Sequence, residues 1–244
     1  DGTTQVVTVT IAGTNDAAVI SGVATASLTE TNAILSTGGA LSATDIDSSA
    51  AFVAQTAVAG SNGYGVFAVN AAGAWTYTTN TAHNEFVAGT NYTDSFTVAT
   101  ADGTTQVVTV TIAGTNDAAV ITGTAAASLT ETNAILSTGG ALSATDIDSS
   151  AAFVAQTAVA GSNGYGVFAV NAAGAWTYTT NTAHDEFAAG TNYTDSFTVA
   201  TADGTTQVVT VTIAGTNDAA VISGVATASL TETNAILSTG GALS

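Results

Sequence analysis

Apolar and polar residues alternate over short stretches of this chain. The clearest stretch is Trp75-Thr76-Tyr77-Thr78, and a second one carries Val108, Val110 and Ile112 on one face. A period of two is typical of a strand with one buried face. Runs that contain Gly, Asn or Asp separate these stretches, as turns separate the strands of an antiparallel sheet. The pattern therefore predicts an all-β protein.

One full repeat of the pattern predicts about seven strands, at residues 19–28, 33–44, 52–59, 64–69, 75–78, 95–100 and 106–113. We expect an interruption of the first strand at Ser21-Gly22 and a bend of the second at Gly38-Gly39. Residues 80–90 are the one stretch that could hold a helical turn. Short strands at regular spacing indicate an antiparallel β-sandwich.

Aromatic residues in these stretches predict the core. Trp75, Phe96 and Val98 are more simply core residues than a ligand platform, because aromatic side chains bury so much area. Tyr92 lies just before the sixth strand, where a tyrosine corner would place it.

The pattern repeats with a long period. The sequence Asp-Gly-Thr-Thr-Gln-Val-Val begins at Asp1, Asp102 and Asp203, which are 101 residues apart. A unit of this size can fold as a domain of its own. We expect sandwiches joined end to end: residues 1–14 as the last strand of a preceding repeat, 15–115 and 116–216 as full repeats, and 217–244 as the start of a further, truncated one. The full repeats differ at only five positions, Ser21/Thr122, Val23/Thr124, Thr25/Ala126, Asn84/Asp185 and Val87/Ala188.

Charge excludes several classes of partner. The chain has 18 acidic residues and no Lys or Arg, so its net charge is −18. Such a chain lacks the basic surface that holds nucleic acid or anionic membranes, and no apolar run approaches the ~20 residues of a membrane span. Charged residues are nevertheless only 7% of the chain and hydrophobic residues 46%, which favours a folded protein. Because Cys is absent, no disulfide stabilises the fold.

Strand topology predicts where the acidic residues gather. Successive strands run in opposite directions, so each sandwich has an entry end, which receives the incoming linker, and an exit end, from which the next linker leaves. We expect Asp45, Asp47 and Asp102 at the entry end, beside the linker residues Asn15 and Asp16. The exit end is expected to hold the turn with Glu30, the corner with Asn84 and Glu85, and the outgoing Asn116-Asp117. Asp94 lies near that corner, but an Asp at the start of a strand can simply cap local backbone groups.

Linking two repeats would then bring acidic residues of both around the linker, with no base to neutralise them. A pair of like charges at ~4 Å costs about 4 kcal/mol at an effective dielectric of about 20. Either the carboxylates splay apart, since Asp-Gly and Asn-Asp are also ordinary turn formers, or a cation lies among them. Oxygen-only ligands favour Ca²⁺ over the stricter Mg²⁺. The sequence thus predicts Ca²⁺ sites, with candidate ligands Asn15, Asp16, Glu30, Asp45, Asp47, Glu85, Asp102, Asn116, Asp117, Glu131, Asp146, Asp148, Glu186, Asp203, Asn217 and Asp218.

No catalytic constellation is recognisable, and we expect no enzyme. Each full repeat has one His (His83, His184), which we interpret as a solvent-facing polar residue of the corner loop. Zinc would need several His or Cys ligands, and nothing places a Ser beside His83 for a catalytic triad.

Several sequence stretches in fixed order resemble the VCBS repeat. They are Gly-Thr-Asn-Asp-Ala, Leu-Thr-Glu-Thr, Leu-Ser-Ala-Thr-Asp-x-Asp-Ser, Gly-x-Trp-Thr-Tyr and Thr-Asp-Ser-Phe-Thr-Val-x-x-x-Asp-Gly-Thr-Thr. The chain is more distantly similar to cadherin repeats, in which a first-strand Glu, an Asp-x-Asp loop and an Asn/Asp linker hold calcium between domains. The resemblance implies an Ig-like, cadherin-like sandwich in a large bacterial RTX or biofilm adhesin, located outside the cell on its surface or in a secreted matrix.

Two functions are compatible with these features. In the first, calcium stiffens the repeats into an extender that projects a binding region from the cell, and the partners are neighbouring repeats of the same chain. In the second, the repeats themselves bind glycan or associate with other copies in an extracellular fibre or filament. Exposed Thr-x-Thr stretches would suit glycan, although alternating Thr is ordinary in a strand.

Overall fold

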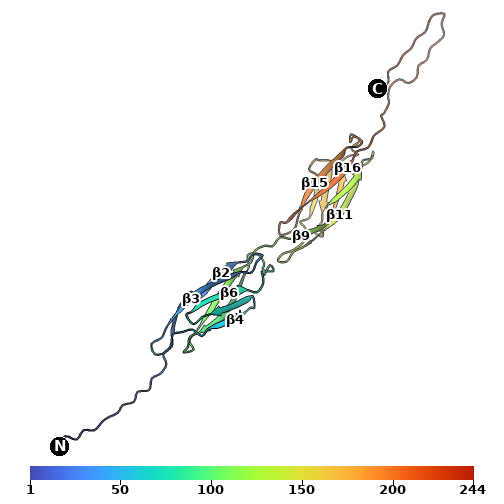
Figure 1. Ribbon diagram of the computed structural model, residues 1–244. Coiled ribbons are helices and arrows are strands. Elements are labelled where there is room, and N and C mark those ends of the chain that lie inside the picture. Colours follow the sequence, from blue (N-terminus) through green and yellow to red (C-terminus); the bar gives the residue numbers. More distant parts are fainter. The chain divides into compact units, whose positions relative to one another are not determined.

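The structure is a computed structural model and describes residues 1–244. The chain forms two compact units, and each contains one sandwich of eight strands (Figure 1). The first unit also includes residues 145–151 and 202–205. The first sandwich consists of β1 (Val19–Gly22), β2 (Thr25–Thr29), β3 (Ser36–Thr44), β4 (Gln55–Ala59), β5 (Gly65–Val69), β6 (Ala74–Thr79), β7 (Asn91–Ala99) and β8 (Thr105–Ala113). The second consists of β9 (Val120–Gly123), β10 (Ala126–Thr130), β11 (Ser137–Thr145), β12 (Gln156–Ala160), β13 (Gly166–Val170), β14 (Ala175–Thr180), β15 (Asn192–Ala200) and β16 (Thr206–Ala214).

Each sandwich has a five-stranded sheet and a three-stranded sheet. In the first, the strand orders are β1-β3-β6-β5-β4 and β2-β8-β7, and the second repeats this topology. Strand pairs of the first sandwich are antiparallel except β2 and β8, which run parallel from Thr25↔Thr109 to Thr29↔Ala113. The all-β sandwich expected from the sequence is therefore confirmed, and none of the chain is a helix long and apolar enough to cross a membrane.

The expected first strand is two strands in different sheets. β1 pairs with β3, whereas β2 pairs with β8, so the chain changes sheets between them. Gly22 makes this possible with a φ of +104°, and a Cβ there would lie 2.6 Å from the Ala40 carbonyl oxygen. Glycine alone adopts this backbone conformation without strain.

The expected bend at Gly38-Gly39 is wrong, because β3 continues through both residues. These glycines instead make room for the neighbouring strand. A Cβ at Gly39 would lie 2.9 Å from the Trp75 indole ring, which packs directly against the backbone of β3. The indole Nε1 donates to the Val23 carbonyl oxygen at 2.7 Å.

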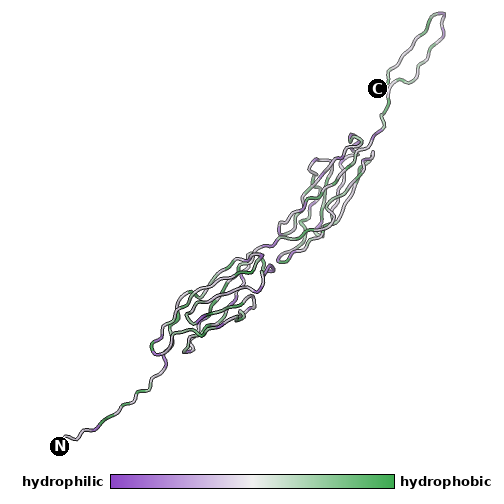
Figure 2. The backbone as a smooth tube through the Cα atoms, viewed as in Figure 1, coloured by the Kyte–Doolittle hydropathy of each residue, from purple (hydrophilic) through white to green (hydrophobic).

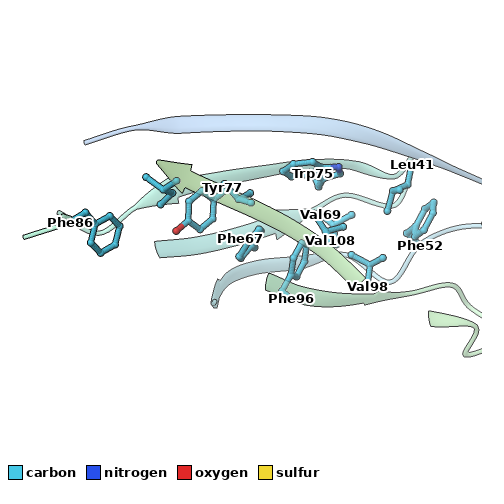
Figure 3. Close-up of a cluster of buried hydrophobic side chains, with 12 residues drawn as sticks. Leu41, Phe52, Phe67, Val69, Trp75, Tyr77, Phe86, Phe96, Val98 and Val108 are labelled. Atoms are coloured by element: carbon cyan, nitrogen blue, oxygen red, sulfur yellow. The ribbon is translucent and has the colours of Figure 1, made fainter. Parts of the chain in front are cut away.

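The core lies between the two sheets, and Figure 3 shows its side chains between the strands, with Phe86 towards one end and Phe52 towards the other. Along β6, Trp75, Tyr77 and Thr79 are buried and the residues between them are exposed. Phe96 and Val98 are buried as expected. Hydrophobic positions follow the strands, and hydrophilic stretches mark loops at the ends of the sandwiches (Figure 2).

The corner between β6 and β7 contains turns and no helix. The Phe86 amide donates to the His83 carbonyl oxygen at 2.9 Å, which closes one turn. Tyr92 supports the corner as expected, because its hydroxyl accepts from the Val87 amide, five residues upstream, at 3.1 Å. Its ring stacks on Phe86 with the ring centres 3.8 Å apart.

Residues 1–14, for which the sequence predicts a strand, form none. Thr4–Ala12 has the same sequence as β8, yet Ile11 is 88% exposed whereas Ile112 is 1% exposed. In β8 these residues lie between β2 and β7. Strand formation here depends on those neighbours rather than on intrinsic propensity.

Candidate cation sites at the ends of the sandwiches

Acidic side chains at the entry end hold the loops and the incoming linker. Asp45 accepts the Asp47 and Ser48 amides on Oδ1, at 3.0 and 2.7 Å, and the Ser48 hydroxyl on Oδ2 at 2.7 Å. These bonds, led by that from the Ser48 hydroxyl, lower the pKa of Asp45. The carboxylate of Asp47 accepts the Asp16 amide at 3.2 Å, which fastens the linker to this loop.

Asp102 holds the same end together from the β7–β8 turn. Its carboxylate accepts from the hydroxyls of Thr100 and Thr104 at 2.5 and 2.7 Å, and from the linker amide of Ala18 at 3.0 Å. The bond from Thr100 is the largest of the causes that hold the pKa of Asp102 far below its usual range. Hydrogen-bond donors already surround this carboxylate.

The equivalent loop of the second repeat differs in burial. Asp148 is 7% exposed and Asp117, whose amide donates to Asp148 Oδ1 at 3.3 Å, is 9% exposed. The other oxygen of Asp148 has no hydrogen-bond partner. Burial raises the pKa of Asp148, and the neighbouring Asp146 and Asp117 charges add to this. Asp203, like Asp102, accepts the linker amide, here that of Ala119, at 3.0 Å.

The exit end of the first sandwich contains buried oxygens without partners. Glu30 directly follows β2 and is 2% exposed. Its amide donates to the Ala113 carbonyl oxygen at the end of β8. Glu30 Oε2 accepts the Thr115 hydroxyl at 2.5 Å, but Oε1 has no partner. Asn84 Oδ1 and Asp117 Oδ2 are likewise buried and unpartnered, and these two residues line one pocket.

The exit end of the second sandwich repeats this arrangement with one more charge. Glu131, Asp185 and Asp218 each offer one carboxylate oxygen, and these oxygens lie within 4.8 Å of one another. Glu131 is 1% exposed, its Oε2 accepts the Thr216 hydroxyl, and its Oε1 has no partner. Asp218 Oδ2 is also buried without a partner. We call Glu131–Asp185–Asp218, and the residues 101 positions earlier, Glu30–Asn84–Asp117, the exit-end clusters.

The corner histidine is buried, so its interpretation as a solvent-facing residue is wrong. His83 is 7% exposed, with a φ of +61°, and its ring stacks on Phe86 with the ring centres 4.6 Å apart. Nδ1 bonds to Glu85 Oε1 and Nε2 to the Tyr64 carbonyl oxygen, both at 2.7 Å. The ring thus fixes the corner that carries Asn84. From the sequence alone, a single His beside aromatic residues does not indicate whether its ring faces solvent or is buried in the corner.

Asp94 has a structural role. An Asp at the start of a strand can cap backbone groups, and Asp94 does so here. It is fully buried on β7 and accepts the amides of Asn62, Tyr64 and Gly65 and the hydroxyl of Tyr77, at 2.9–3.2 Å. It therefore supports the β4–β5 turn from within and is no part of an exit-end cluster.

The structure brings together some of the predicted ligands and separates others. Glu30, Asp117, Glu131 and Asp218 belong to the exit-end clusters, whereas Glu85 and Glu186 bond to the corner histidines. Asn15, Asn116 and Asn217 each donate their side-chain amide to the next residue's carbonyl oxygen. The members missed as candidate ligands are Asn84 and Asp185. The sequence did contain a signal for these two residues. Asn84 and Asp185 occupy equivalent positions, and theirs is the one substitution between the full repeats that changes the charge.

A family comparison covers both full repeats. The model of the bacterial cadherin-like domain matches residues 15–114 and 116–215. The chain belongs to this family. Cadherin-like domains are extracellular modules of adhesion or structural type, so the two copies in this chain are tandem modules of that kind. A comparison with curated protein sequences gives no match.

Solved structures similar to the cadherin-like repeats include animal cadherins. Drosophila N-cadherin EC1-4 is 16% identical with a TM-score of 0.45, over 83% of this chain and 50% of that one. Mouse cadherin-23 EC22-24 is 16% identical with a TM-score of 0.43, over 83% of this chain and 67% of that one. Protocadherin gamma B2 domains 1–5 are 14% identical with a TM-score of 0.49, over 84% of this chain and 40% of that one. The chain thus spans about half the length of N-cadherin EC1-4.

The cadherin-like exit ends suit a hard divalent cation. Every candidate donor atom is an oxygen, and Ca²⁺ accepts six to eight oxygens in flexible geometry. A buried oxygen without a partner costs free energy unless something compensates it, and no Lys or Arg exists in the chain to do so. Carboxylates that are buried together need a counter-charge. The residues present therefore fit Ca²⁺.

Proposed function

We propose that these repeats are calcium-stiffened extender modules of a large bacterial surface adhesin of the VCBS type, secreted by an RTX route into a biofilm or surface layer. Glu30, Asn84 and Asp117 would hold the ion at the exit end of the first repeat, and Glu131, Asp185 and Asp218 at that of the second. The linker loop with Asp146 and Asp148 would add ligands beside Asp117. The repeats would perform no catalysis, and their partners would be their own neighbours.

One observation carries this proposal: an almost fully buried glutamate in each repeat, Glu30 and Glu131, keeps one carboxylate oxygen unpartnered. In the second repeat, carboxylate oxygens of Glu131, Asp185 and Asp218 lie within 4.8 Å of one another. When bound, the ion would supply the positive charge that the side chains of this chain lack.

Asp117 connects ion binding to stiffness. Its side chain offers an unpartnered oxygen beside Asn84, while its amide is bound by Asp148. An ion held by Asp117 would therefore fix the linker residue itself. Fixing the linker restricts the directions in which successive repeats can point, which would turn a flexible string of repeats into a spacer.

Thermal unfolding and small-angle X-ray scattering of the 244-residue chain, in Ca²⁺, Mg²⁺ and EDTA, test the proposal. A ligand at 100 times its Kd stabilises the folded state by about 2.7 kcal/mol, so we expect Ca²⁺ to raise Tm by on the order of 10 °C. The maximum particle dimension should be larger and better defined in Ca²⁺ than in EDTA, with Mg²⁺ less effective.

Identical melting curves and dimensions in all three media would overturn the proposal. Concentration-dependent scattering in Ca²⁺, or retention on glycan, would instead favour repeats that bind to each other or to carbohydrate.

A further inference from the structure

The outer edge of β7 in the first sandwich is covered. β7 ends the three-stranded sheet, and β4 with its flanking residues lies along it. Four backbone carbonyl oxygens of β7 accept hydrogen bonds from that side. The donor–acceptor pairs are Asn62 Nδ2 to Thr93, the Ser61 amide to Ser95, Gln55 Nε2 to Thr97 and the Val53 amide to Ala99, at 2.6–3.2 Å. An edge that is covered in this way does not pair with a further strand.

The opposite edge of the same sheet is β2, and no strand lies beyond it. The Ala24 carbonyl oxygen and the Glu30 amide, on either side of β2, both bond to β8. Because alternate residues of a strand direct their backbone groups to opposite sides, Thr25, Ser27 and Thr29 present theirs outward. β2 also has no charge, proline or bulge, the features that usually block an edge. It is therefore open to pairing with another strand.

The sequence of β2 is complementary to itself when two copies run antiparallel. With Ser27 opposite Ser27 of the second copy, Thr25 lies opposite Thr29, and Ala26 lies opposite Leu28. Hydroxyl side chains then face each other on the exposed side of the sheet, where such pairs form cross-strand hydrogen bonds. On the half-buried side, a small residue faces a large one. A two-fold axis through Ser27 gives the self-complementary interface that a symmetric dimer needs.

We propose that the outer edge of β2, and the equivalent edge of β10, pair antiparallel with the same edges of a second copy of this chain. Two three-stranded sheets then join into one continuous sheet. β10 differs from β2 only at Ala126, which replaces Thr25 and removes one pair of hydroxyls. Charge favours contact at this place. Except for the buried Asp94, the acidic residues of the first repeat lie in loops and linkers, not on its strands.

One pair of five-residue edges forms a small interface, so each contact is weak. Edges that recur along one chain strengthen each other through their effective concentration wherever they engage together. The partner is thus a neighbouring chain that lies alongside. This inference does not rest on the proposed function, because β2 contains no candidate ion ligand. It predicts association in EDTA as well as in Ca²⁺.

Analytical ultracentrifugation of the full chain over a concentration series tests the inference, in Ca²⁺ and in EDTA, at about 0.15 M salt to screen the negative charge. We expect the weight-average mass of the wild type to rise with concentration in both media. Ser27→Lys together with Ser128→Lys places like charges opposite each other at the centre of each pair. Association should then weaken on the order of tenfold.

Thr76→Lys together with Thr177→Lys is the matched control. It adds the same two charges at exposed positions of β6 and β14, which lie inside the five-stranded sheets and form no edge. This variant should associate like the wild type.

Mixing charge variants tests the register. Ser27→Asp with Ser128→Asp should also associate weakly alone, but its mixture with Ser27→Lys and Ser128→Lys should recover wild-type association, because opposite charges then face each other. The same Asp variant mixed with the Thr76→Lys and Thr177→Lys chain should show no such recovery. General attraction between basic and acidic chains would act in both mixtures alike.

A wild-type chain that stays monomeric throughout the series overturns the inference. Association that appears only in Ca²⁺, or that the lysines at residues 27 and 128 weaken no more than the control does, also overturns it, because the contact then lies elsewhere. Melting curves of the same chains test the proposed function separately. The scattering comparison for that function is made with the variant that carries Ser27→Lys and Ser128→Lys, in which lateral pairing is suppressed.

Discussion

The two ends of the first sandwich carry similar acidic side chains in different surroundings. At the entry end, Asp45 and Asp102 accept hydrogen bonds from serine, threonine and backbone donors. At the exit end, Glu30 is more deeply buried, and its Oε1 has no hydrogen-bond donor in the protein. Acidic composition alone therefore does not identify an ion site. The supply of donors around each carboxylate distinguishes an acid that holds a turn from a candidate cation ligand.

The largest effect is expected from replacing the buried glutamates. Glu30→Gln together with Glu131→Gln removes a charge from each exit-end cluster while keeping the shape of the side chain and an acceptor for Thr115 or Thr216. We expect most of the calcium-dependent rise in Tm, on the order of 10 °C, to be lost. Differential scanning calorimetry in Ca²⁺ and in EDTA measures this, and an undiminished rise would place the ion elsewhere.

Entry-end substitutions should act without calcium. Asp102→Asn with Asp203→Asn replaces a carboxylate that accepts several donors by an amide that accepts on one side only. Charge-assisted hydrogen bonds are lost, so Tm should fall by a few degrees, equally in Ca²⁺ and in EDTA. If the fall appeared only in Ca²⁺, Asp102 would be acting as an ion ligand and the contrast between the two ends would fail.

The same variant predicts a change in acid stability. The pKa of Asp102 is lowered in the folded state, mainly by the Thr100 hydroxyl. Its contribution is therefore fully present above the unfolded value of about 3.9 and is lost as pH falls towards the lower folded pKa. Below about pH 4, in EDTA, the wild type should lose this stability, whereas the Asp102→Asn contribution should not change with pH.

The smallest effect is expected at the corner. Glu85→Gln and Glu186→Gln remove carboxylates that bond to the histidines, and the bond from His83 is the main cause that lowers the pKa of Glu85. Because these oxygens face the imidazole, the Kd for Ca²⁺ should change by less than about twofold, as expected for a screened charge outside the coordination shell. A change as large as that from Glu131→Gln would return Glu85 and Glu186 to the ligand set.

Much of the fold follows from alternation in the sequence. The clean period of two at Trp75–Thr78 predicts a half-buried strand, and β6 has that burial pattern. Glycines were harder to interpret. The chain passes from one sheet to the other at Gly22, Gly38 lies against the Trp75 carbonyl oxygen, and Gly39 lies against the Trp75 indole. All three look alike in a sequence because their roles depend on residues of distant strands.

The exit-end clusters could be predicted only in part, because their members also depend on contacts between distant parts of the chain. Strand direction alone assigns Glu30 and Asp117 to one end of the sandwich. Choosing between the adjacent residues Asn84 and Glu85 requires the course of the corner, which depends on the buried ring of His83 and its bond to the Tyr64 carbonyl oxygen. That arrangement has no periodic signal, so the charged residue looked like the better ligand.

Parallel pairing of β2 with β8 has a mechanical consequence. The chain enters the first sandwich through the four-residue β1, which pairs with β3, continues into β2, and leaves directly after β8. β2 and β8 point the same way in a five-residue register. A pull on the two ends of this domain drags the strands past each other in shear. The hydrogen bonds between β2 and β8 then bear the load together instead of breaking one after another. This geometry resists tension along the chain.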